Sequence, residues 1–189
     1  MSRRSDVDHR ADTELRFDSL FQAHHDAVYR YCVRRIGRSD AEDAAADVFA
    51  VAWRRLEEMP PGDASRAWLL AVAYKVVGNR YRARRRQARL STRLEAMKVG
   101  DSRLTDFEST PSADVQLLHI ALDGLSPTDQ ELLRLWSWDA LTRYEIAYVL
   151  GIKENAVDQR LHRARSRLKA RFDRLDAGTQ NIEPEEAPA

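Results

Sequence analysis

The chain has 189 residues, with 31 lysine and arginine residues, 30 aspartate and glutamate residues and a formal net charge of +1. This length fits one ordinary domain or two small ones, and 32% charged residues favour small cores with charged faces over one large core. Cys32 is the single cysteine, which excludes an intramolecular disulfide framework and a cysteine metal cluster and fits a reducing compartment.

Neither a membrane span nor a targeting segment is evident. The longest apolar run, Ala67 to Tyr74, is far shorter than the roughly 20 residues that cross a bilayer. The first residues, MSRRSDVDHRADTELR, have no apolar signal core, and residues 1–13 are expected to be flexible. We therefore expect a cytoplasmic protein with no membrane insertion.

The first half of the chain repeats its apolar residues at helical spacing. A helix is predicted from Glu14 to Ile36, and Gly37 would end it. A capping box formed by Ser39 and Glu42 predicts a second helix, which the segment 60–62 (PPG) ends after about residue 59. Asp63 or Ser65 would cap a third helix, which runs through AWLLAVAYKVV into the arginines before residue 93. Because that stretch is apolar nearly all round, it predicts the central helix of a bundle.

The second half begins after residues 94–114, which lose the periodicity and predict a flexible acidic linker. Apolar periodicity resumes at Val115, and Ser126-Pro127 predicts a helix start with proline where its missing N–H costs nothing. The acidic, proline-containing residues 173–189 predict a disordered tail. The fold class is therefore all-α, with two small helical domains, residues 14–93 and 115–172, joined by the linker.

The clearest motif lies in the second domain. Thr142 and Glu145 form a capping box for a short helix, and Gly151 stands where a left-handed residue would end it. A second helix begins near Glu154, and its seam of Val157, Leu161, Ala164 and Leu168 can pack on Ile146, Val149 and Leu150. A short helix, a glycine turn and a longer basic helix predict a DNA-binding helix-turn-helix rather than a hairpin with a solvated basic face.

The second of these helices would lie in the major groove. Asn155, Gln159, Arg160 and Arg163 are predicted to face base edges, because Asn and Gln can pair with adenine and Arg with guanine. Lys153, His162 and Arg165 are predicted to contact phosphates.

Acidic and basic residues separate onto two helices of the first domain. The acids are Asp40, Glu42, Asp43 and Asp47, with Phe49 and Trp53 as apolar anchors. We interpret them as a docking surface for a basic helix of a partner; the alternatives are a solvated face and a metal site.

The basic run, residues 75–93, holds eight cations and no acid, and Trp68, Tyr74 and Tyr81 stand in it or just before it. Cations that follow phosphates and aromatic rings that stack on unpaired bases predict contact with both duplex and opened DNA; a solvated basic linker is the alternative.

Together these segments resemble a known family. DAEDAAADVFAVAWRR, RAWLLAVAYKVVGNRYRARRR and LSPTDQELLRL followed by LTRYEIAYVLGIKENAVDQRLHRARSRL are similar to extracytoplasmic-function (ECF) sigma factors of bacterial RNA polymerase. The resemblance covers roughly residues 14–172. It implies a sigma-2 domain at residues 14–93 and a sigma-4 helix-turn-helix domain at residues 115–172.

The resemblance also implies roles for these residues. The acidic helix would dock on the clamp helices of the largest polymerase subunit, and residues 59–65 would capture a flipped base of the non-template strand. The minus-10 promoter element would be contacted by Trp68, Tyr74, Asn79, Arg80, Arg82, Arg84, Arg85 and Arg86. The minus-35 element would be contacted by Lys153, Asn155, Asp158, Gln159, Arg160, His162, Arg163 and Arg165. Partners would be core RNA polymerase, promoter DNA as duplex and melted non-template strand, and an anti-sigma factor.

Three positions depart from the family pattern. Lys153 replaces a small capping residue, Asp47 stands where glutamine is frequent, and Asp158 stands where lysine is frequent. Asp158 would repel a phosphate, accept a hydrogen bond from a cytosine amino group, or pair with His162.

We accordingly predict a sigma factor that opens the minus-10 region through binding energy, without enzymatic activity, cofactor, metal or small-molecule substrate. Two alternatives stay open: an autonomous helix-turn-helix regulator, and a metal-dependent nucleic-acid enzyme that uses Asp40, Asp43 and Asp47.

Overall fold

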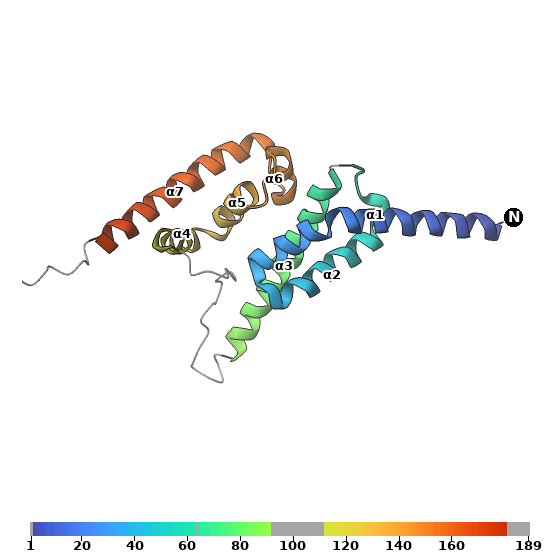
Figure 1. Ribbon diagram of the computed structural model, residues 1–189, viewed down its shortest axis with the longest axis horizontal. Helices are drawn as coiled ribbons and strands as arrows, with labels where there is room; N and C mark the ends of the chain where they lie inside the picture. The colour runs from blue at the N-terminus through green and yellow to red at the C-terminus, as the bar shows by residue number, and fades with distance from the viewer. Residues whose placement is uncertain (1, 63, 92–111, 181–189) are drawn as a thin grey trace, which may run out of the picture. The chain divides into compact units, whose positions relative to one another are not determined.

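The computed structural model describes residues 2–62, 64–91 and 112–180, and the regular elements in these ranges are all helices (Figure 1). This confirms the predicted all-α class. The chain divides into two compact units, built around the helices on either side of the linker. Most of the predicted linker, and residues 181–189 of the predicted tail, lie outside the described residues. No described helix combines the length and apolar composition that crossing a membrane requires.

Three helices and one short turn form the first unit. These are α1 (Ser2–Ile36), α2 (Arg38–Arg54), the 3-10 turn η1 (Leu56–Glu58) and α3 (Ala64–Ser91). The inner face of α2 is made of small side chains that are at most 2% exposed: Ala41, Ala44, Ala45, Val48 and Ala52. Because small side chains shorten the distance between helix axes, α1 and α3 can approach α2 closely. All three helix pairs are in contact, so α3 is one side of a three-helix arrangement and not its surrounded centre.

The ends of α2 correct one prediction. Gly37 ends α1 as predicted, with a φ of 79° that glycine adopts without steric cost. However, Gly37 itself is the N-cap of α2 and no side chain caps this helix, so the predicted capping box of Ser39 and Glu42 is wrong. α2 therefore begins two residues earlier than expected, which places Ser39 inside its first turn.

The described residues 112–180 form four helices: α4 (Ala113–Asp123), α5 (Pro127–Ser137), α6 (Arg143–Leu150) and α7 (Glu154–Gln180). The second unit contains α4, α5, α7 and the residues of α6 up to Ala147. Both α4 and α5 pack on α7. The core contains leucines of α5 together with Ala121, Ile146, Val157, Leu161 and Ala164. α7 therefore provides the packing surface for α4 and α5.

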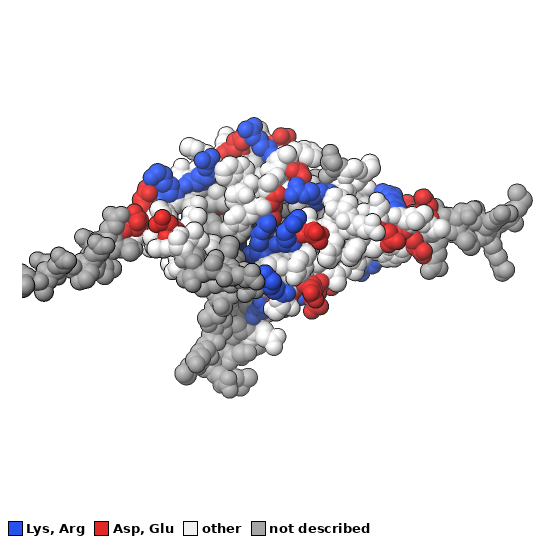
Figure 2. All heavy atoms as spheres, viewed as in Figure 1, with Lys and Arg blue, Asp and Glu red and all other residues white. Residues whose placement is uncertain are grey.

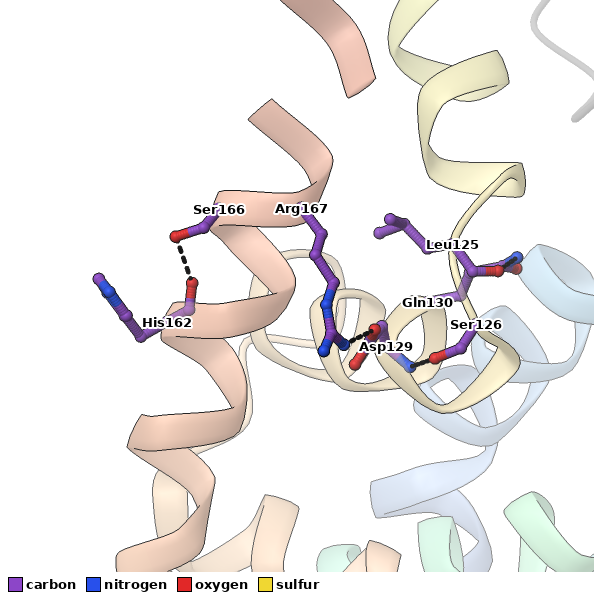
Figure 3. Close-up of polar contacts among 7 residues, drawn as sticks. All are labelled: Leu125, Ser126, Asp129, Gln130, His162, Ser166 and Arg167. Atoms are coloured by element: carbon purple, nitrogen blue, oxygen red, sulfur yellow. Dashed lines mark hydrogen bonds and ion pairs between the residues drawn. The ribbon is translucent and has the colours of Figure 1, made fainter. Parts of the chain in front are cut away.

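Side-chain hydrogen bonds fix the start of α5 (Figure 3). The Ser126 hydroxyl accepts a hydrogen bond of 3.2 Å from the Asp129 amide, and Pro127 follows as the first helical residue, as predicted. The Gln130 side chain donates to the carbonyls of Asp123 and Leu125, at 3.0 Å each, and so ties α5 to the end of α4. Arg167 of α7 donates to Asp129 at 2.7 Å, which links the same turn to α7.

Two helices extend beyond their predicted bounds. α1 begins at Ser2 instead of Glu14, because residues 2–36 contain neither glycine nor proline to stop it. α7 continues to Gln180, past the predicted start of the disordered tail at residue 173. Half-buried Phe172 and Leu175 carry the apolar seam onward, and Lys169 pairs with Asp173 at 2.8 Å. The prolines of the tail come too late in the sequence to end the helix earlier.

Cys32 belongs to the core of the first unit. Its side chain is completely buried, and this burial raises the pKa of the thiol from 9.0 to about 11. The thiol is therefore protonated at neutral pH and behaves as a small apolar side chain.

Replacement of Ser126 by alanine should lower the free energy of unfolding by about 1 kcal/mol, because the Asp129 amide loses its cap. Ser112 is the matched control: it is the N-cap of α4, but its side chain makes no capping hydrogen bond. Urea unfolding monitored by circular dichroism measures both variants, and equal losses for Ser126→Ala and Ser112→Ala would contradict the assignment.

Candidate nucleic-acid and protein interfaces

The helix-turn-helix has the local geometry that the sequence predicts. The Glu145 carboxylate accepts from the Thr142 amide at 2.8 Å, and the Thr142 hydroxyl accepts from the Glu145 amide at 3.3 Å, which completes the capping box. Gly151 has a φ of 63°, and the Ile152 amide then donates to the Ala147 carbonyl at 3.0 Å. The predicted seam is buried at Val157, Leu161 and Ala164 and half-buried at Leu168. α7 is thereby fixed against the rest of its unit with its charged face outward.

The polar residues predicted to contact the minus-35 element all lie exposed at the start and on the outer face of α7. They are Lys153, Asn155, Asp158, Gln159, Arg160, His162, Arg163 and Arg165. Four of these side chains contact other described side chains. Arg163 donates to the Gln159 side chain at 3.5 Å, and Asp158 pairs with Arg143 at 2.9 Å. The guanidinium carbon of Arg165 lies 5.1 Å from the centre of the Trp136 ring.

The partner of Asp158 was not predicted. The sequence offered His162 one turn later, whereas the structure pairs Asp158 with Arg143 of α6. The backbone carbonyl of His162 accepts a 2.9 Å hydrogen bond from the Ser166 hydroxyl (Figure 3). Only the turn at Gly151 brings Arg143 and Asp158 together, so spacing along one helix could not reveal the pair.

Arginines of α3 meet acids of α2 inside the first unit. Arg80 pairs with Asp47 at 2.6 Å, and Arg84 pairs with Asp40. The order of these pairs shows that the two helices run antiparallel here. The two acids were predicted to face a protein partner and the two arginines to face DNA, so their contact with each other was not predicted. Basic and acidic side chains are interspersed on the visible surface, with larger uncharged areas between them (Figure 2).

The other predicted minus-10 residues are polar residues of α3 and two aromatic residues. Asn79, Arg82 and Arg86 are exposed, and Arg82 donates to the Asn79 side-chain oxygen at 2.6 Å. The side chain of Arg85 lies outside the described residues. Among the aromatic residues, Tyr74 is 36% exposed but Trp68 is only 6% exposed. Trp68 therefore belongs to the core, together with its neighbours Leu69 and Leu70, which is a correction to its predicted stacking role.

A groove lies between α1 and α2 on the first unit. It is lined by Phe21, His25, Asp26, Tyr29, Glu42, Ala46 and Phe49. Phe21 and Phe49 are in ring contact at 4.7 Å, and Phe49 is only 4% exposed, so it forms the base of the groove and not a projecting anchor. Nearby, the Trp53 ring meets Phe17 edge-on at 5.0 Å and remains 44% exposed. An apolar base with acidic side chains at its edge suits an amphipathic basic helix.

The segment between η1 and α3 is attached to α1. Met59 is buried, and the Ser65 hydroxyl lies 2.9 Å from His24 Nε2 and donates to the Gly62 carbonyl at 2.7 Å. Gly62 has a φ of 65°, which lets the chain turn sharply before α3. Asp63, one of the predicted caps, lies outside the described residues. The predicted base-capturing segment, residues 59–65, is thus anchored at both ends.

Among the described side chains, no group of three or more His, Cys, Asp and Glu residues is arranged to hold a metal ion. Asp40 and Asp47, proposed as ligands in the alternative interpretation, each contact an arginine instead.

Comparison with known proteins defines the class. Residues 20–87 match Sigma-70 region 2, and residues 116–168 match Sigma-70, region 4. The chain is 30% identical over 167 residues to the ECF RNA polymerase sigma factor SigL of Mycobacterium tuberculosis, covering 83% of this chain and 89% of SigL. It is 29% identical over 163 residues to the RNA polymerase sigma factor CnrH of Cupriavidus metallidurans, covering 80% of this chain and 84% of CnrH. Two other curated relatives are longer, and the match spans 60% and 57% of their lengths.

The fold agrees with these matches. The sigma factor RpoE of Bartonella quintana, solved with the anti-sigma factor NepR, has a TM-score of 0.64 and 22% identity, covering 83% of this chain and 96% of RpoE. The chain belongs to the ECF sigma factors of RNA polymerase. It is therefore a transcription initiation factor with region 2 and region 4 domains, in a family that is not enzymatic.

The reassignment of Trp68 can be tested by stability. Trp68→Ala should lower the free energy of unfolding by about 3–5 kcal/mol, because it leaves a cavity in a buried site. Trp53→Ala removes the same side chain from a position that is 44% exposed and should cost clearly less. Urea unfolding followed by far-ultraviolet circular dichroism compares the two variants. If both lose a similar free energy of unfolding, the assignment of Trp68 to the core is contradicted.

Proposed function

We propose that this chain recruits core RNA polymerase to a restricted set of promoters, reads the minus-35 element with α7 and opens the minus-10 element with α3. The observation that carries this proposal is the presence, in one ECF sigma chain, of an exposed cationic recognition helix and a separate unit with an acid-edged groove. A duplex-binding regulator has no need of the second feature.

Readout of the minus-35 element would depend on the first turns of α7. Asn155, Gln159 and Arg160 are exposed on these turns, where a recognition helix meets base edges. Amide side chains suit adenine and arginine suits guanine, whereas Lys153, His162 and Arg165 would contact phosphates. The guanidinium carbon of Arg165 lies 5.1 Å from the centre of the Trp136 ring, so a cation–π interaction limits the movement of this side chain.

Opening of the minus-10 element would depend on α3 and the segment before it. Exposed Asn79, Arg82 and Arg86 provide polar and cationic groups along one helix, and Tyr74 offers an exposed ring. Unpaired bases stack on aromatic rings while cations follow the backbone, so these residues can favour the opened strand over the duplex. Arg80 and Arg84 are paired with Asp47 and Asp40, so part of their positive charge is offset within the protein.

Polymerase would bind at the groove between α1 and α2. Glu42 and Asp43 are exposed on α2, and apolar residues line the groove beside Glu42. Asp40 and Asp47 contribute less free negative charge, since each is paired with an arginine of α3. We therefore assign the electrostatic part of docking mainly to Glu42 and Asp43, with Phe49 and Trp53 providing apolar contact.

Regulation by an anti-sigma factor and a cytoplasmic location complete the proposal. RpoE was solved with the anti-sigma factor NepR, and CnrH with the cytosolic domain of CnrY. By analogy, an anti-sigma protein would occupy the same surfaces that bind polymerase and DNA and would keep this chain inactive.

Run-off transcription tests the function directly. Purified chain, mixed with sigma-free core polymerase and a library of genomic fragments, should produce RNAs whose start sites share a minus-35 and a minus-10 sequence. Sequencing of the RNA 5′ ends gives both elements at once. The absence of chain-dependent start sites would refute the proposal.

Charge reversal tests the docking surface. The double variant Glu42→Arg, Asp43→Arg should reduce affinity for core polymerase by roughly tenfold or more, because it places like charges against a basic helix. Asp12→Arg, on the exposed side of α1, is the control for an acid-to-arginine change outside the groove. Pull-down and fluorescence anisotropy with core polymerase measure the effect; unchanged affinity of the double variant with an intact circular dichroism spectrum contradicts the assignment.

A further inference from the structure

The exposed stretch of α7 from Asn155 to Arg167 contains a single acidic residue, Asp158. It lies next to Gln159 and one turn before His162, on the turns proposed to enter the major groove. A carboxylate at that position lies near DNA phosphates, and the repulsion weakens DNA binding. A nearby cation can offset this repulsion, or a hydrogen bond from a base to the carboxylate can compensate for it. The structure shows how it is offset.

Nε of Arg143, the first residue of α6, lies 2.9 Å from Oδ1 of Asp158, so the two side chains form an ion pair. The two side chains are 66% and 53% exposed, respectively. Exposed ion pairs contribute little to folding stability, so stabilisation of the fold is a weak reason for this contact. The pair does, however, place a cation beside the carboxylate at the start of the recognition helix.

The contact leaves acceptor capacity on the carboxylate. The ion pair with Arg143 is made at Oδ1, and a carboxylate has about four lone-pair sites on its two oxygens, so Oδ2 can accept a hydrogen bond. In the major groove, the group that suits a carboxylate acceptor is the exocyclic amino group of cytosine. Amide neighbours such as Gln159 can serve as donor or acceptor, whereas an ionised Asp158 is acceptor-only and therefore selects a donor.

We infer that Asp158 is a specificity-determining residue that reads one cytosine in the minus-35 element, and that Arg143 is its positioning residue. Arg143 holds the carboxylate in place and offsets its charge against the flanking phosphates. This inference rests on the proposed function, because it requires α7 to bind promoter DNA. It adds α6 to the elements that determine which promoter is chosen.

The test uses full-length chain bound to core polymerase and a promoter library randomised across the minus-35 element. Asp158→Asn should abolish the preference for cytosine at one base pair and leave the other positions unchanged. Arg143→Ala should weaken binding to the selected promoter by roughly tenfold, because the carboxylate then faces phosphates without its cation. The double variant Arg143→Ala, Asp158→Asn should recover most of that loss, which an independent phosphate contact of Arg143 would not allow.

The chain supplies a matched control farther along α7. Lys169 and Asp173 form another exposed ion pair, at 2.8 Å with side chains 77% and 55% exposed. Lys169→Ala and Asp173→Asn repeat both charge changes away from the first turns and should leave the base preference unchanged. Circular dichroism checks that each variant retains its helices.

The outcomes separate the inference from the proposed function. If Asp158→Asn raises affinity for all sequences equally, the carboxylate only repels DNA and the inference is overturned. If Arg143→Ala and Lys169→Ala have equal effects, or if the double variant shows no recovery, the positioning role of Arg143 is overturned. If the unmodified chain selects no minus-35 sequence at all, the proposed function falls and the inference falls with it.

Discussion

The close packing of α2 against its two neighbours is the constraint on which the first unit depends. The alanines on its inner face are almost completely buried, so α1 and α3 lie near enough for side chains at the edges to meet. On one edge, Asp47 reaches Arg80; on the other, Phe49 reaches Phe21. A larger side chain at Ala44 or Ala45 would separate the helices and disturb both edges. The same packing thus shapes the groove and positions the arginines of α3.

The formal net charge of +1 does not show how the charged side chains of this chain are distributed. Several of them lie at contacts between helices, where acids and arginines pair. Within the first unit, arginines of α3 and acids of α2 satisfy each other. Within the second unit, Arg143 and Arg167 hold acids of other helices. A DNA or protein partner that needs the full charge of one member of such a pair must compete with the other member. This competition lowers non-specific attraction to nucleic acid, because a cation engaged within the protein releases fewer counterions from DNA.

The two units use different means to present their functional faces. In the second unit, local signals dominate: the capping box at Thr142, the left-handed Gly151 and the Ser126 cap fix where helices begin and end. In the first unit, tertiary packing dominates, since α2 begins without a side-chain cap and depends on burial of its alanines. A recognition helix must be held in one orientation toward DNA, and rigid local caps suit that requirement.

The sequence by itself determined the features that arise from neighbours along the chain. Helical periodicity, Gly37, Ser126-Pro127 and the Thr142 box all act within one or two turns, and their residue types are sufficient to place them. Only the tertiary structure decided which polar and aromatic residues are available at the surface. Trp68 is buried, and Asp158 is held by Arg143, because residues distant in the sequence pack there. Periodicity reports the face of a helix on which a side chain lies, but the side chain's partner depends on the helix that comes to lie beside it.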